Sequence, residues 1–213
     1  MKKKLLSLKS LALAALLSTA AVAHADITVF TTQAAFLAAV SAPGTDTYDD
    51  LLVGGTYPSP LPRLAGTYSY TAATSSINGF FPVGSGTDHW LSTVVPTDSI
   101  IFSTFAPGVV ALGGFFFGTD VGGTPLPATT ITLTAQSGET QTVELNGANV
   151  GTFLGFLSTS QLTSVVMNVT QPANDFAWAT VNDLTLAVPE PASYGMLLAG
   201  LGLVGFMARR RAA

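Results

Sequence analysis

The chain has 213 residues and a mass of 21.8 kDa, enough for one domain of ordinary size with short flanking segments. Between residues 26 and 188 the only cationic side chain is Arg63, whereas this stretch holds 11 of the 12 Asp and Glu residues, all but Glu190. So acidic a body cannot neutralise phosphates, which excludes nucleic-acid binding as its main role. The absence of cysteine excludes disulfides, Cys-ligated zinc, iron–sulfur clusters and thiol nucleophiles.

The N-terminal segment is typical of a secretory signal peptide. Lys2–Lys4 form a basic start, and an apolar stretch follows over residues 11–22. Ala23 and Ala25 then place small residues at positions −3 and −1 of a cleavage site. The apolar stretch is short for a bilayer core of about 30 Å, which disfavours a transmembrane helix. We therefore expect export, removal of this segment by signal peptidase, and a mature chain that begins at Asp26.

One helix is predicted in the body, from Thr31 to Val40. Thr31 or Thr32 is suited to the N-cap, and Pro43-Gly44 follows as a stop signal. The rest is rich in Thr, Val, Ile and Phe, broken at short intervals by Gly and Pro, which favours strands. The predicted strands are Ile27–Phe30, Thr45–Asp49, Gly66–Ala72, Ile77–Phe81, Ser99–Phe105, Val109–Gly118, Thr129–Ala135, Thr140–Leu145, Thr152–Leu157, Leu162–Thr170 and Phe176–Leu186.

This order of elements predicts an all-β fold. Apolar and polar residues alternate most clearly over 130–134 and 142–145, and Ser137-Gly138-Glu139 between them predicts a hairpin turn. A parallel α/β fold would need helices between the strands, and the sequence supplies none. Three prolines in Gly54–Arg63 predict an extended loop there. We expect a two-sheet antiparallel β-sandwich of jelly-roll kind with one short N-terminal helix.

The C-terminal end carries three ordered features. Pro189-Glu190-Pro191 precedes sixteen uncharged residues, 193–208, and the cluster Arg209, Arg210 and Arg211 follows. As a helix, the uncharged stretch would span about 24 Å, slightly less than the usual hydrocarbon thickness. Arginines next to an apolar segment stay in the cytoplasm, so we expect a precursor anchored in the inner membrane with its body outside.

These three features resemble the PEP-CTERM sorting signal. The resemblance implies that an exosortase, a membrane enzyme, recognises and cleaves the tail in a Gram-negative bacterium that makes exopolysaccharide. It divides the chain into a signal peptide (1–25), a β-sandwich domain (26–187) and a sorting signal (188–213). An ordinary C-terminal anchor is the alternative.

The body also resembles a carbohydrate-binding module or a related lectin-like sandwich. The likeness rests on the opening strand and Ala-Phe-rich helix, on Tyr48-Asp49-Asp50-Leu51, and on the closing strand 176–186. It has no sharp motif, so it implies the fold rather than an activity.

A structural calcium site is one interpretation of three aspartates. Asp49 and Asp50 follow an early strand, Asp183 lies in the last one, and such strands are often neighbours in a jelly roll. Calcium prefers hard oxygen ligands and would offset the repulsion between the carboxylates. The alternative is three solvated aspartates at loop ends.

Sugar binding would need an exposed aromatic ring near a carboxylate or amide. The candidates are Tyr57, and Trp90 beside Asp88; Tyr68 with Tyr70 form a further pair. The alternative is that Trp90 and Trp178 are core or rim aromatics.

Catalysis has little support in the sequence. His89 is the only histidine of the mature body, and its neighbour Asp88 would point to the opposite face of a strand. We expect no catalytic residues and no enzymatic activity. The sequence therefore favours an exported, non-catalytic protein in or on the exopolysaccharide layer, at the cell surface or outside the cell. The alternatives are a secreted polysaccharide hydrolase with a carboxylate pair and a purely structural matrix or surface protein.

Overall fold

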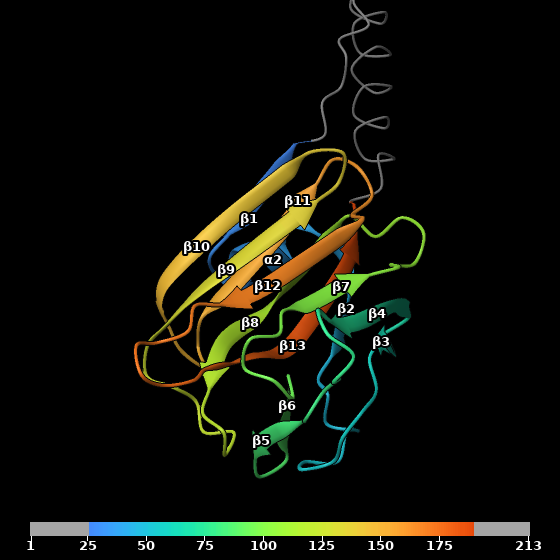
Figure 1. Ribbon diagram of the computed structural model, residues 1–213. Coiled ribbons are helices and arrows are strands. Elements are labelled where there is room, and N and C mark those ends of the chain that lie inside the picture. Colours follow the sequence, from blue (N-terminus) through green and yellow to red (C-terminus); the bar gives the residue numbers. More distant parts are fainter. Residues whose placement is uncertain (1–25, 190–213) are drawn as a thin grey trace, which may run out of the picture.

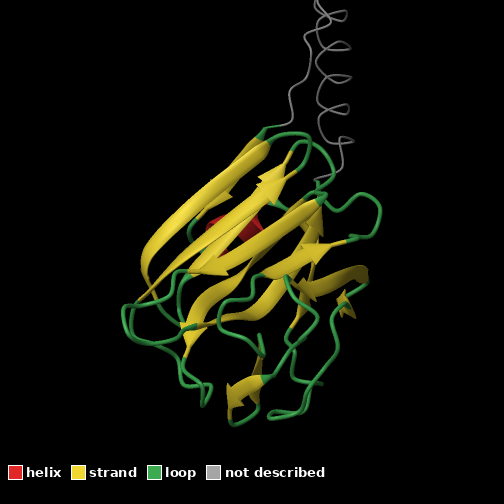
Figure 2. Cartoon of the chain, viewed as in Figure 1, coloured by secondary structure: helices red, strands yellow, loops and turns green. Residues whose placement is uncertain are grey.

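Two antiparallel sheets pack against each other in residues 26–189, the part of the chain that this computed structural model describes (Figure 1). Strands dominate, and one short helix lies against them (Figure 2). The predicted all-β, two-sheet sandwich with a single N-terminal helix is therefore confirmed. The predicted signal peptide with Ala23 and Ala25, and the tail residues Glu190, Pro191, Arg209, Arg210 and Arg211, lie outside the described residues.

The first sheet has seven strands. In spatial order they are β1 (Ile27–Phe30), β11 (Phe153–Ser158), β8 (Ala111–Thr119), β13 (Trp178–Val188), β6 (Asp88–Ser92) and β5 (Val83–Ser85), with β2 (Ser41–Asp46) also paired to β13. The second sheet has six strands, β10 (Thr140–Ala148), β9 (Thr129–Gln136), β12 (Ser164–Val169), β7 (Ile100–Ser103), β4 (Tyr68–Thr74) and β3 (Leu61–Ala65).

The core follows from the alternation of the strands. In β9, Ile131, Leu133 and Ala135 are buried between the sheets, whereas the threonines between them face outward. The central strands β8 and β13 are buried on both faces along most of their length. Other elements must therefore cover the outer face of the first sheet.

The helix α2 (Gln33–Ala39) supplies part of that cover. Its N-cap is Thr32, whose hydroxyl accepts from the backbone N–H of Ala35 at 3.4 Å, as one of the two predicted caps. Phe36 is fully buried against β8 and β11, where glycines make room for its ring. A Cβ added at Gly155 would come within 2.6 Å of this ring. The predicted stop was wrong, because the helix ends before Val40 and Pro43-Gly44 lie inside β2.

The structure differs from the predicted strands in two other places, which are short or contain proline. The predicted loop 54–63 ends in strand β3, which tolerates Pro62 because β3 is the edge strand of its sheet. The predicted strand Ile77–Phe81 does not form. Phe80 makes only isolated bridges, to Tyr57 and Thr93. Strands β5 and β6 were not among the predicted strands.

The two ends of the described chain lie at the same end of the sandwich, at the top of Figure 1. Asp26 exchanges hydrogen bonds with Thr159, and Pro189 lines a hollow together with Thr28 and Thr159. Strand β13 runs from the end that carries β5 and β6 toward this end. No helix within residues 26–189 is both long and apolar enough to cross a membrane.

Candidate functional site

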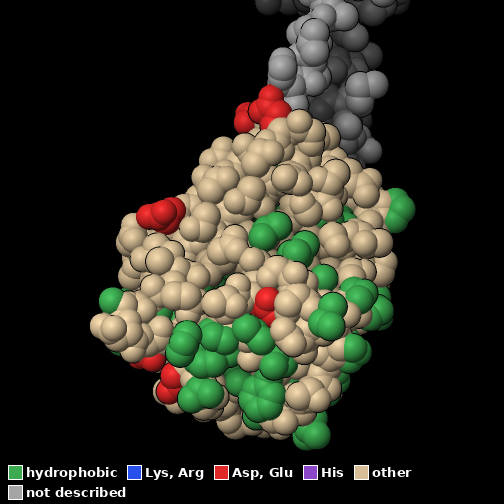
Figure 3. Space-filling view, in the orientation of Figure 1, with side chains coloured by type: hydrophobic (Ala, Val, Ile, Leu, Met, Phe, Trp, Pro, Cys, Tyr) green, Lys and Arg blue, Asp and Glu red, His purple; other side chains and the backbone are tan. Residues whose placement is uncertain are grey.

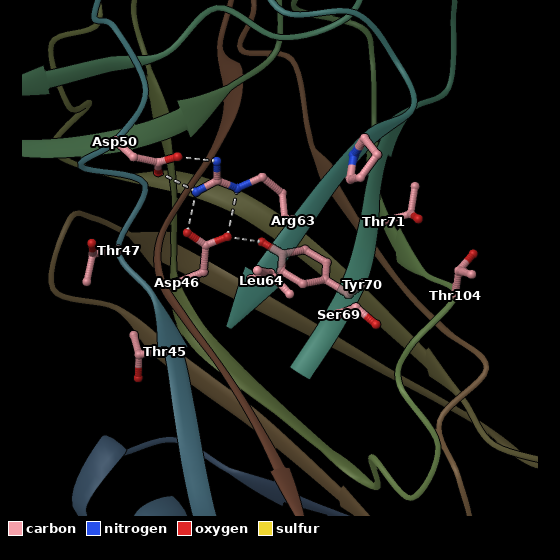
Figure 4. A pocket seen from close by; sticks show the side chains of 11 residues that line it. Thr45, Asp46, Thr47, Asp50, Arg63, Leu64, Ser69, Tyr70, Thr71 and Thr104 are labelled. Atoms are coloured by element: carbon pink, nitrogen blue, oxygen red, sulfur yellow. Dashed lines mark hydrogen bonds and ion pairs between the residues drawn. The ribbon is translucent and has the colours of Figure 1, made fainter. Parts of the chain in front are cut away.

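Arg63 lies in a hollow on the body with a volume of about 690 Å³ (Figure 4). From β3, its Nε and Nη2 donate to the two carboxylate oxygens of Asp46 at 2.9 and 2.5 Å. Its Nη1 and Nη2 donate to Asp50 at 2.9 and 2.6 Å. One guanidinium thus binds two carboxylates, each through both oxygens. We call this place the Arg63 hollow; hydroxyl-bearing residues complete its walls, namely Thr45, Thr47, Ser69, Thr71 and Thr104.

Two buried tyrosines support the ion pair. The hydroxyl of Tyr70 donates to Asp46 at 2.7 Å, and the hydroxyl of Tyr48 lies 3.0 Å from that of Tyr70. The guanidinium carbon of Arg63 lies 5.3 Å from the centre of the Tyr48 ring, a cation–π distance. Burial raises the pKa of both tyrosines well above the usual value, so both stay protonated and act as hydrogen-bond donors.

The electrostatics of the Arg63 hollow favour the charged forms. Burial alone would lower the pKa of Arg63, but the hydrogen bonds that it donates to Asp46 and Asp50 raise this pKa above the usual range. The hydrogen bond from Arg63 lowers the pKa of Asp50. Because Asp46 ends β2 in the first sheet and Arg63 lies on β3 in the second, the network ties the two sheets together at one edge. The charged groups of this network bind each other, which is typical of a network that stabilises the fold.

The structure only partly gathers the three aspartates of the predicted calcium site. Asp50 binds Arg63, whereas Asp49 accepts from the backbone N–H of His89 at 3.0 Å. Burial, followed by the charges of Asp88 and Asp49, raises the pKa of Asp183, so these three carboxylates are electrostatic neighbours. Among residues 26–189, no three His, Asp or Glu side chains are grouped to hold a metal ion. The calcium site thus gains no support here and stays a prediction.

Of the predicted sugar contacts, Trp90 needs a correction. Trp90 is only 4% exposed and its ring packs edge-on against Phe117, with ring centres 5.3 Å apart, so it has no open face for a sugar. The hydroxyl of Tyr57 accepts from the backbone N–H of Leu52 at 2.9 Å. Asp88 accepts from the Asn182 amide at 3.0 Å. For Tyr57 and Asp88, sugar binding stays a prediction.

His89 is held by the chain around it. Its Nδ1 lies 2.9 Å from the carbonyl oxygen of Leu51, and its backbone N–H binds Asp49. These bonds fix the ring against the segment after β2.

The second tryptophan lines a smaller hollow of about 180 Å³, which we call the Trp178 pocket. Its walls are mostly apolar, made by Trp178, Phe81, Val83, Val94 and Val121, and its polar members are Ser92, Thr93 and Asp120. Beside the pocket, the ring of Phe176 is 57% exposed and stands edge-on to Trp178, with ring centres 6.2 Å apart. Hydrophobic side chains gather on this end of the body, opposite residues 26 and 189 (Figure 3).

The geometry of the Trp178 pocket is fixed by hydrogen bonds. The indole Nε1 of Trp178 donates to the carbonyl oxygen of Val94 at 3.1 Å, which holds the ring in one orientation. Asp120 begins a tight turn, in which its Oδ1 accepts from the backbone N–H groups of Gly122 and Thr124, both at 2.8 Å. Its other oxygen takes no part in these bonds. Sequence reasoning named Trp178 only as a core or rim aromatic, and it missed Asp46.

Comparisons with known proteins find a match for the C-terminal tail and none for the body. Neither a search of curated proteins nor one of solved structures finds a match for this chain. Residues 187–211 match the family model of the PEP-CTERM protein-sorting motif. The resemblance seen in the sequence is thereby confirmed for the tail, and the carbohydrate-binding-module likeness of the body is not. The motif marks the chain as an exported protein whose membrane-anchored precursor is processed by exosortase.

Proposed function

We propose that this protein is a non-catalytic glycan-binding protein of the cell-surface exopolysaccharide layer, and that it binds polysaccharide at the Trp178 pocket. Signal peptidase would remove the leader before exosortase processes the tail.

The fixed, accessible indole of Trp178 carries the proposal. Aromatic faces pack against the C–H faces of sugar rings, and a neighbouring carboxylate accepts bonds from sugar hydroxyls. Trp178 supplies the face, Phe176 extends it, and the second oxygen of Asp120 supplies the acceptor. Because the Val94 carbonyl already holds the indole, little conformational entropy is lost when a sugar binds.

The position of the pocket suits a protein that is anchored by its tail. Strand β13 begins at Trp178 and ends at Val188, inside the matched motif. Its 11 residues span about 35 Å at the usual rise of an extended strand. The pocket and the sorting motif therefore lie at opposite ends of one strand. An anchored precursor would present the Trp178 pocket away from the membrane.

The Arg63 hollow is larger but less suited to a ligand. The donors and acceptors at its centre already bind each other, and a ligand would have to break those bonds to use them. We therefore assign it to stability.

The test is binding of the purified protein to the exopolysaccharide of its own host. We expect saturable binding that Trp178→Ala weakens by roughly thirty-fold and that Trp90→Phe, at the buried tryptophan, leaves unchanged. Equal binding by both variants would overturn the assignment of the site. No binding to any polysaccharide would favour a structural matrix protein. Release of reducing sugar, lost on replacement of single Asp or Glu residues, would favour the hydrolase.

Sorting is tested separately in the host. Glu190→Gln, or deletion of Arg209–Arg211, should leave an uncleaved precursor in the membrane fraction, seen as a larger band on an immunoblot. The matched control is Glu139→Gln, in the turn before β10. Normal processing of both tail variants would remove the exosortase assignment.

A further inference from the structure

The surroundings of the Trp178 pocket are acidic. Asp120 lies in its wall, and Asp175 binds the backbone N–H of Phe176 beside it. The only Lys or Arg side chain of residues 26–189 is Arg63, which binds Asp46 and Asp50 in the Arg63 hollow. Within the described residues, no cationic side chain is available to a carboxylate or sulfate on a ligand. Asp120 would repel the charge of an acidic sugar at this pocket, and no cation of the described residues offsets that repulsion.

The walls of the pocket are more apolar than a fully hydroxylated sugar requires. Val83, Val94 and Val121 line it together with the rings of Phe81 and Trp178. Valine side chains offer no hydrogen bonds, so a sugar hydroxyl turned toward them would lose its water without replacement. A methyl or acetyl group in the same place would bury apolar surface instead.

The size of the pocket limits the ligand to a small unit. Its volume of about 180 Å³ is below the roughly 300–1,000 Å³ of pockets that enclose drug-sized ligands. The Trp178 pocket can enclose one ring of a polysaccharide or one substituent of such a ring. The exposed Phe176 ring beside it would contact the next unit of the chain.

Resting on the glycan-binding function proposed above, we infer that the Trp178 pocket selects neutral sugars that carry a methyl or acetyl group, such as 6-deoxyhexoses and N-acetylhexosamines, and rejects uronic acids and sulfated sugars. The valine walls take the apolar group, and Asp120 accepts from a ring hydroxyl.

The experiment uses an array of glycans arranged in matched pairs. Each pair shares its ring and linkage, and differs by one substituent: methyl or acetamido against hydroxyl, and hydroxymethyl against carboxylate. We expect the 6-deoxy and N-acetyl members to bind about ten-fold more tightly than their hydroxylated partners. The uronates should bind at least ten-fold more weakly than the neutral members at low salt, with a gap that narrows as salt rises.

Asp120→Asn separates charge from shape. The amide keeps the Oδ1 acceptor that holds the turn, so the pocket retains its form while it loses the negative charge. We expect the gap between uronates and neutral members to narrow in this variant, because the repelling charge is gone. The neutral members themselves should weaken by about ten-fold or less, because the amide NH₂ replaces the oxygen that accepts from the ring hydroxyl. Preference for uronates or for fully hydroxylated sugars in the unaltered protein would overturn the inference and leave glycan binding intact. Failure of every glycan on the array would instead overturn the proposed function.

Discussion

The Arg63 hollow and the Trp178 pocket use polar and aromatic groups in opposite ways. In the Arg63 hollow the charged groups of Arg63, Asp46 and Asp50 bind each other above two buried tyrosines. In the Trp178 pocket, hydrogen bonds hold the indole edge and one oxygen of Asp120. The face of the indole and the second oxygen of Asp120 take no part in these bonds. Groups that are satisfied within the protein contribute to folding, and groups that remain free serve binding. Changes in the first hollow should therefore alter stability and changes in the second should alter affinity.

The largest effect on stability is expected from Arg63→Ala. It leaves the carboxylate of Asp46, only 4% exposed, without its cation, and breaking such a buried pair costs about 3–5 kcal/mol. Urea denaturation measures the change, and Trp178→Ala, at a half-buried side chain, is the comparison. A loss below about 1 kcal/mol for Arg63→Ala, the range of exposed pairs, would show that the network is not the structural centre described here.

Glycan affinity, in contrast to stability, should depend on the Trp178 pocket more than on the Arg63 hollow. Trp178→Ala removes the central aromatic contact, which by analogy with binding hot spots costs about 2 kcal/mol, or roughly thirty-fold in Kd. Phe176→Ala removes only the flanking ring and should cost about 1 kcal/mol or less. Isothermal titration with a glycan that binds the unaltered protein measures both. If Phe176→Ala proved the more damaging, the binding surface would lie outside the pocket.

Acid should reduce the stability that the Asp50–Arg63 ion pair contributes. The pKa of Asp50 is lowered in the folded protein from the usual value of 3.8, so its stabilising effect is complete above that value. The effect is lost as the pH falls through the lower folded pKa. Because the Asp50 side chain is 67% exposed, Asp50→Asn should cost about 1 kcal/mol or less at neutral pH. Denaturation at several pH values checks this, since the two proteins should converge below pH 3.8.

Replacement of Asp183 should raise the stability, the opposite of the effect at Asp50, and it should cause the smallest change. The folded pKa of Asp183 is raised by burial and by Asp88 and Asp49, so ionisation destabilises the fold as the pH rises through that pKa. Asp183→Asn should therefore raise stability at neutral pH by about 0.5 kcal/mol, as relief of like charges on a sheet does. Asparagine also tolerates the positive φ of 50° at this residue.

Thermal melts measure the Asp183 effect, and the gain should vanish in acid. Melts with added calcium and with a chelator test the calcium prediction alongside. A midpoint that calcium raises in the unaltered protein, but not in Asp183→Asn, would support a metal at these carboxylates.

Most of the fold was predictable because it rests on local patterns. The alternation in 129–135 and 140–145, with glycine at the turn between them, placed β9 and β10 correctly. Strand β3 was missed because prolines oppose strands in general and are tolerated only at an edge, which a sequence does not reveal.

The sites were less predictable because they depend on contacts between distant residues. A single cation among 11 carboxylates signals that Arg63 has acidic partners, but its choice of Asp46 follows from the pairing of sheets. Trp90 and Trp178 both lie in strands, and only the tertiary packing decides that the first is buried and the second lines a pocket.

The central claim, that glycans bind at Trp178, is tested most directly by the two indole N–H signals in a ¹⁵N-correlated NMR spectrum. The chain has only two tryptophans, and Trp178→Phe assigns the signals by removing one. Titration with a glycan that binds should move the Trp178 signal in a saturable way and leave the buried Trp90 signal in place. A bound glycan that moves the Trp90 signal, or neither signal, would contradict the account.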